Sequence, residues 1–197
     1  MRRFTRLGSP QLITDHWEEI GAQYTTRRAD DPNYSFSWPQ RKNQRINQVA
    51  LPVLSQQTND HCSYCDTFPL HRGSNTIDHF KPKTNPLYYS LVCQWENLYL
   101  TCTHCQDSKG VVYNDLLLRP DDSNFSFSHY FIYNYAEHKI EPNPSASDTD
   151  QARAKFTIDT FDFNYPSVKT SRRHAFERYQ MANHPDINDF NYRFMFD

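Results

Sequence analysis

The chain has 197 residues, of which 37% are hydrophobic, 15% are aromatic and 22% are charged, and its formal net charge is −2. This near balance excludes a protein that coats nucleic acid with positive charge, and the short aliphatic runs exclude a membrane-spanning helix. The basic first ten residues have no apolar segment behind them, so we expect a cytoplasmic chain without a secretory signal.

The charge is unevenly distributed along the chain. Residues 1–50 carry eight basic and five acidic side chains (+3), residues 51–119 carry five and six (−1), and residues 120–197 carry eight and twelve (−4). Any contact with nucleic acid must therefore be local or be supplied by a partner. The alternative for the basic first part is a solvated helix surface.

The first sixty residues are expected to be helical. A Ser-Pro pair at 9–10 suits a helix start, and apolar residues then recur at helical spacing to about Arg28. A second helical stretch is expected from near Gln40, and Pro52 is expected to bend or restart it.

Shorter elements follow in the rest of the chain. We expect a strand at 75–80, a second strand or extended segment at 95–100, and a brief helix that ends at Gly110. The last elements are a small hairpin and two terminal helices, at 130–143, 150–161 and 165–182.

Five cysteines stand at positions 62, 65, 93, 102 and 105. An odd number without a secretory signal favours reduced thiols that bind metal. Four of them form C-x2-C-x36-C-x2-C, in which each pair brings two sulfurs to one tetrahedral ion. We predict a closed, structural zinc site at Cys62, Cys65, Cys102 and Cys105. Cys93, among apolar neighbours, is expected to be a buried inert thiol.

An Asp-His pair, Asp78-His79, lies between the two cysteine pairs, in "IDHFKPK". Thiolates prefer zinc or iron, whereas a carboxylate prefers a hard cation such as Mg²⁺. The stretch therefore indicates two metals with different tasks. A histidine titrates close enough to neutral pH to accept a proton from water.

The ordered pattern C-x-x-C, "IDHFKP", "NL" and "CTHCQDSK" resembles the HNH endonuclease family. This resemblance implies a ββα centre pinned by a four-cysteine zinc. Outside residues 62–110 the chain more loosely resembles an HNH subgroup that accompanies retron or Septu-type anti-phage systems, alongside an ABC-type ATPase. We predict an α+β fold with a single domain over 1–197, made of a helical part, the zinc-pinned ββα core, and a hairpin with C-terminal helices, at 1–60, 61–110 and 111–197.

The resemblance also implies roles for individual residues. His79 matches the general base that activates the attacking water, and Asp78 matches a ligand of a catalytic Mg²⁺ or Mn²⁺. Asn97 matches the asparagine whose side chain ties down the loop that holds the base. Lys109 matches a lysine that we expect to contact phosphate.

Gln106 departs from the family pattern, which usually has His or Asn as the second metal ligand. A Gln carbonyl oxygen can bind Mg²⁺, but its longer arm moves the ion or requires a shifted helix. His104 and Asp107 are the nearby alternatives. Gln106 remains our candidate ligand, with a helix-surface position as the alternative.

The function implied is phosphodiester hydrolysis by a metal-dependent endonuclease. Its substrate is DNA, with RNA or tRNA as an alternative, and it acts as the effector of an anti-phage complex with an ATPase. A retron reverse transcriptase and its msDNA are further candidate partners. The competing hypothesis is a zinc-stabilised module with weak or lost catalysis that binds nucleic acid or protein.

Both ends of the chain are rich in aromatic residues. They either form the chain's own core or dock onto the ATPase. The residues concerned are Phe4, Trp17, Tyr24, Phe36 and Trp38 at one end, and Phe190, Tyr192, Phe194 and Phe196 at the other.

Overall fold

The computed structural model of the chain describes residues 1–70, 75–183 and 185–196. Over these residues it is a mixed α/β protein with three two-stranded antiparallel sheets. None of the described helices combines the length and the apolar composition that a bilayer span requires.

The N-terminal part contains two helices, α1 (Gln11–Asp30) and α2 (Ile46–Thr58). Gly21 on α1 lies against the 3-10 helix η1 (Pro86–Leu91), where a Cβ atom would stand only 2.1 Å from the Ser90 carbonyl oxygen. Glycine therefore allows α1 to pack this closely.

The prediction of a helix from near Gln40 is wrong by six residues. Residues 40–45 form a small hairpin of β1 (Gln40–Arg41) and β2 (Gln44–Arg45) before α2 begins. Lys42 and Asn43 both have positive φ, 47° and 62°, which suits a two-residue hairpin turn. Pro52 lies inside α2, which continues without a restart to Thr58.

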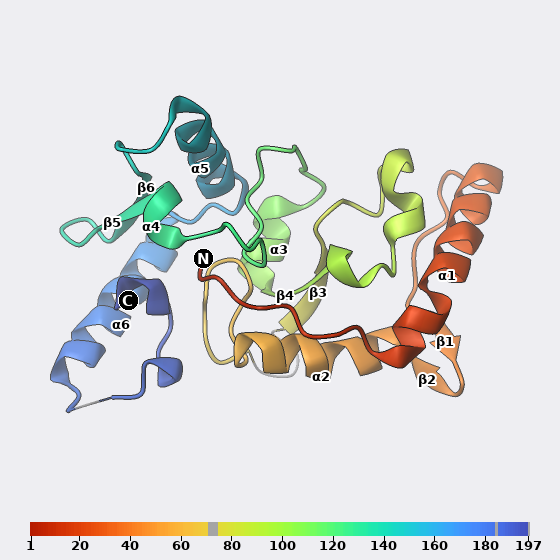
Figure 1. Cartoon of the computed structure of the whole chain (residues 1–197), viewed down its shortest axis with the longest axis horizontal. Helices are drawn as coiled ribbons and strands as arrows, with labels where there is room; N and C mark the ends of the chain where they lie inside the picture. Colours follow the sequence, from red (N-terminus) through yellow and green to blue (C-terminus); the bar gives the residue numbers. More distant parts are fainter. Residues whose placement is uncertain (71–74, 184, 197) are drawn as a thin grey trace.

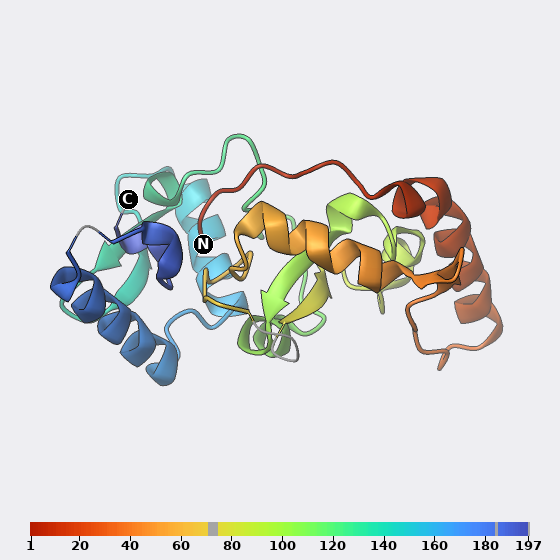
Figure 2. The same ribbon diagram turned by 90° about the horizontal axis from the view of Figure 1, so that it is seen from below.

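The centre of the molecule is the antiparallel pair β3 (Asn75–His79) and β4 (Leu98–Cys102). Its register runs from Asn75 opposite Cys102 to His79 opposite Leu98. Helix α3 (Thr103–Lys109) follows β4 directly and ends at Gly110, whose φ is 51°. Figures 1 and 2 show the hairpin between α2 and α3. The strand at 75–80 and the brief helix are thus as predicted.

The C-terminal part contains the predicted hairpin and two helices. After α4 (Phe127–Tyr130), strands β5 (Phe131–Asn134) and β6 (Lys139–Pro142) pair, and α5 (Asp148–Thr160) and α6 (Pro166–Met181) follow. Figure 1 shows α1 and α6 at opposite ends of an elongated molecule. Two 3-10 helices, at 187–189 and 193–195, complete the chain.

The aromatic residues of both ends contribute to the chain's own core. Tyr24, Tyr192 and Phe194 are buried, and the other six are half-buried. Typical contacts are Tyr24 with Phe36, at 5.5 Å between ring centroids, and Phe194 with Phe127, at 4.5 Å. The first of the two alternatives therefore holds for the three buried residues, whereas the six half-buried ones keep part of their surface exposed.

Candidate metal and catalytic centre

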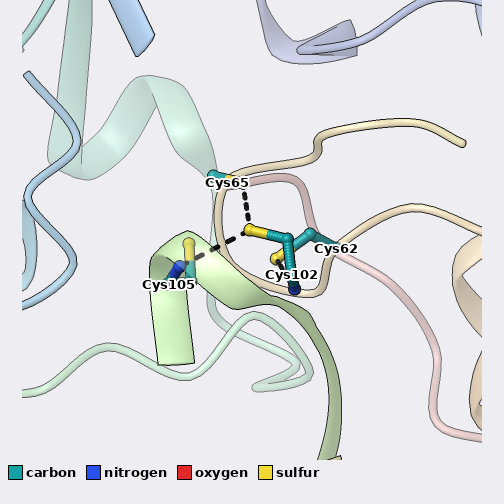
Figure 3. Close-up of side chains that lie close together, drawn as sticks. All are labelled: Cys62, Cys65, Cys102 and Cys105. Atoms are coloured by element: carbon teal, nitrogen blue, oxygen red, sulfur yellow. Dashed lines mark hydrogen bonds between the residues drawn. The ribbon is translucent and has the colours of Figure 1, made fainter. Parts of the chain in front are cut away.

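Four cysteine sulfurs come together at one end of the β3–β4 hairpin. Cys62 and Cys65 lie in the turn after α2, Cys102 ends β4, and Cys105 lies in the first turn of α3 (Figure 3). Their Sγ atoms all lie within 4.8 Å of one another, and all four residues are buried. The predicted cysteine cluster is confirmed as a possible metal site.

The geometry of this cluster fits a tetrahedral ion. Zinc–sulfur bonds of about 2.3 Å imply sulfur–sulfur distances of about 3.8 Å, and Cys65 Sγ lies 3.6 Å from Cys102 Sγ. The backbone N–H of Cys102 donates to Cys62 Sγ at 3.4 Å, and that of Cys105 donates to Cys102 Sγ at 3.5 Å. Burial and the neighbouring sulfurs raise the pKa of the Cys105 thiol well above its usual value. A bound cation is therefore what would allow all four thiols to ionise.

Cys93 is fully buried away from this cluster, as predicted. Burial raises the pKa of its thiol to about 12, so it stays protonated and unreactive.

His79 ends β3 and is only 4% exposed. Its Nε2 lies 2.9 Å from the carbonyl oxygen of Val92. Since a carbonyl can only accept a hydrogen bond, Nε2 carries the proton of the neutral ring and Nδ1 keeps its lone pair. This tautomer has one nitrogen fixed by the backbone and the other able to accept a proton.

Two aromatic residues from the segment before β1 cover the His79 ring. Trp38 stacks on it, with centroids 5.5 Å apart and an interplanar angle of 18°, and Phe36 contacts it edge-on at 5.6 Å. Burial, followed by the nearby charge of Lys83, lowers the pKa of His79 to about 3. The ring is therefore neutral at physiological pH but a weak proton acceptor in this closed arrangement.

Asp78 is held on the other side of the strand. Its Oδ2 accepts a hydrogen bond from Tyr64 at 2.9 Å and lies 3.1 Å from Lys109 Nζ, which is also 3.3 Å from Oδ1. Burial raises the pKa of Tyr64 well above its usual value, so its hydroxyl remains a donor. β3 is regularly paired through His79, so neither residue bends toward the other.

Lys109, which we expect from the resemblance to contact phosphate, is fully buried. Besides Asp78, its Nζ donates to the carbonyl oxygen of His79 at 2.8 Å. The ammonium group therefore stands against the carboxylate where a catalytic cation was expected. Both oxygens of Asp78 are already engaged, so this arrangement does not fit a divalent ion. Among the described residues, the four cysteines are the only group of three or more His, Cys, Asp or Glu side chains placed to hold a metal ion.

Gln106 lies half-buried on α3, and its side chain makes no hydrogen bond with a described residue. Of its two alternatives, His104 places Nε2 3.2 Å from the carbonyl oxygen of Asp162, and Asp107 is exposed. The structure therefore brings none of the three into contact with Asp78.

Asn97 ties two segments together beside His79. Its side-chain oxygen accepts from the Lys81 backbone N–H at 2.7 Å, and its Nδ2 donates to the carbonyl oxygens of Lys81 and Leu91, each at 3.1 Å. These contacts fix the loop that follows His79 and the turn that precedes Val92. Such a tether is what the resemblance implies for this asparagine.

Sequence reasoning did not identify four residues that define the surroundings of Asp78 and His79. Trp38, Phe36 and Val92 contact His79, and Tyr64 contacts Asp78. Tyr64 lies inside the first C-x-x-C, which is a local signal for proximity to the centre. The other three had no such signal, because the sequence does not show which side chain an aromatic or apolar residue will contact.

No family model matches the chain. It is similar to the Septu protein PtuB of Bacillus mycoides strain KBAB4, with 31% identity over 67 residues. The similarity covers 28% of this chain and 23% of that protein, so the chain matches under a quarter of its relative's length.

Proposed function

We propose that this chain is an HNH-type endonuclease that hydrolyses phosphodiester bonds of nucleic acid and is stabilised by a structural zinc. The observation that carries the proposal is His79, whose Nε2 is fixed on Val92 while Nδ1 keeps its lone pair. The Asn97 tether and the order β3, β4, α3 beside four cysteines support it.

His79 would take a proton from the attacking water through Nδ1. Lys81 and Lys83 follow it in the sequence and supply positive charge for a phosphate. A requirement for Mg²⁺ or Mn²⁺, with Asp78 and Gln106 as ligands, rests on the family resemblance alone.

In the described conformation the reaction cannot start, because water does not reach a ring that is only 4% exposed. We infer that Trp38 and Phe36 keep the enzyme closed and must leave His79 before cleavage. Similarity to a Septu protein supports a role in anti-phage defence, in which an ABC-type ATPase partner delivers substrate and triggers opening. The isolated chain should therefore cut slowly.

The test is cleavage of plasmid, linear DNA and total RNA with Mg²⁺, Mn²⁺ or EDTA, with and without the co-expressed ATPase. His79→Ala should lower the rate by about 10²–10⁴, whereas His174→Ala, at an exposed site on α6, should not change it. Wild-type turnover by His79→Ala would refute the assignment. Loss of cleavage in EDTA with retained folding would establish the requirement for a divalent ion.

The second candidate is a zinc-stabilised binding module without catalysis. The buried Asp78–Lys109 ion pair favours it, because it leaves no carboxylate free for a cation. Binding of nucleic acid without cleavage, in the wild type and after Trp38→Ala, would support this alternative.

A further inference from the structure

Two cavities share the first residues of the chain. One has a volume of about 440 Å³ and lies beside the C-terminal end of α2, and the other has about 370 Å³ and lies beside α4. Arg2 and Arg3 line both of them. Figures 1 and 2 agree in placing the N-terminus between these two elements. The two cavities, the larger half and the smaller half of the candidate site, therefore adjoin at Arg2 and Arg3.

The larger half is positively charged. Its described lining includes Arg2, Arg3 and Arg193 but only one carboxylate, Asp66. Arg193 already binds that carboxylate, with Nη2 2.6 Å from Oδ1. Arg3 is exposed and makes no hydrogen bond or ion pair with any described residue. Its guanidinium group is available to an anion.

Two polar atoms in the wall of the same half lack partners. Ser63 is 3% exposed and its Oγ makes no hydrogen bond in the described part of the chain, and the same holds for Nε2 of Gln57. Buried polar atoms are nearly always bonded. Both atoms are themselves inaccessible to solvent, as are the unbonded polar atoms of Arg6, His16 and Asn47, so they do not identify a ligand, and the case for one rests on the arginines and the aromatic wall.

The smaller half is aromatic. Phe125, Phe127 and Phe194 line it, and Phe127 is half-buried and stacked on Phe194 with an interplanar angle of 16°. Flat aromatic faces beside cationic side chains are the usual platform for a nucleobase.

We propose that the two halves form one binding site for a nucleotide unit, with the base against Phe127 and the phosphate at Arg3. The site is separate from His79. Cys62 lines it, whereas His79 lies at the far end of β3, about 13 Å along the strand from the residue paired with Cys102. The proposal does not rest on the proposed nuclease activity, because it concerns binding alone.

The test is fluorescence anisotropy of a labelled (dT)12 strand with the full chain, without added Mg²⁺ or Mn²⁺. Arg3→Ala should weaken binding about tenfold and lower the slope of log affinity against log salt by about 0.7, the value for one phosphate contact on a single strand. Phe127→Leu keeps an apolar side chain but removes the stacking face, and should also weaken binding about tenfold. Thermal melts identify any variant that fails to fold.

Lys155→Ala removes one exposed positive charge from α5, so it should bind (dT)12 as the wild type does. Displacement of the strand by thymidine 5′-monophosphate would assign the site to free nucleotides. Absence of displacement, with the variant effects retained, would assign it to nucleotides within a strand. The proposal is overturned if the wild type does not bind (dT)12, or if folded Arg3→Ala and Phe127→Leu bind it as the wild type does.

Discussion

The two ends of the β3–β4 hairpin differ in whether their candidate functional side chains are free to bind a ligand. At the Cys102 end, four sulfurs within 4.8 Å face one another in the arrangement that a zinc ion requires. At the His79 end, the two residues that the family resemblance makes catalytic are already engaged by the protein, His79 by Trp38 and Asp78 by Lys109. The same hairpin thus combines a preformed metal site with a closed candidate active site.

This difference has a physical basis. Four thiols cannot all ionise in a buried cluster without a cation, so the arrangement is useful only with its metal in place. A general base acts only when water and substrate reach it. Side chains that cover it, as Trp38 and Phe36 cover His79, therefore keep it inactive until they move away. The following predictions test both halves of this comparison.

The largest expected effect is at the cysteines. Cys102→Ser or a strong chelator should unfold the chain, because a structural zinc supplies about 10 kcal/mol or more, comparable to the whole stability of a domain. Elemental analysis should find about one zinc per chain. Cys93→Ser is the matched control and should retain the metal. A folded, metal-free protein would contradict the prediction.

The second prediction concerns the buried ion pair. Lys109→Met should destabilise the fold by about 3–5 kcal/mol, because it leaves the Asp78 carboxylate buried without its partner. The double variant Asp78→Leu/Lys109→Met should recover most of this loss. Urea unfolding measures both. Near-wild-type stability of the single variant would mean that Asp78 is not held as described.

The third prediction concerns pH. The unfolded chain protonates His79 near pH 6.5, but burial keeps the pKa of the folded residue at about 3. The free energy of unfolding therefore falls as pH drops below about 6.5. The contribution of His79 to this fall is about 2 kcal/mol between pH 7 and pH 5. The difference between wild type and His79→Gln in urea midpoints across this range measures it. Parallel pH profiles would show that His79 titrates normally in the folded protein.

The smallest effect is expected at Gln106. Its side chain has no partner among the described residues, so Gln106→Asn should change stability by less than about 0.5 kcal/mol. If position 106 is a metal ligand, Gln106→Asn should retain or raise Mn²⁺-dependent cleavage and Gln106→Ala should lower it. Equal rates for all three proteins would make Gln106 a surface residue.

The features predicted best from the sequence are those that depend on local residue spacing and residue type. The spacing of the cysteines and the tetrahedral preference of zinc placed four distant thiols together. Helical spacing of apolar residues placed α1, strand-like residues placed β3, and Gly110 placed the end of α3. The β1–β2 hairpin was missed because Lys42-Asn43 adopts positive φ without glycine. Lys109 was expected to contact phosphate because no local pattern reveals its partner Asp78. The cover over His79 comes from residues about forty positions earlier, and only tertiary packing selects that contact.

The central claim is that His79 is a catalytic base closed by Trp38. The most direct measurement compares nucleic-acid cleavage by the wild type, Trp38→Ala and Trp38→Ala/His79→Ala, with Trp17→Ala as the control at another half-buried tryptophan. We predict that Trp38→Ala cuts about tenfold faster than the wild type or more, as the pKa of His79 rises toward its ordinary value. The double variant should not cut, and Trp17→Ala should match the wild type. No acceleration in folded Trp38→Ala, or cleavage that survives in the double variant, would contradict the account.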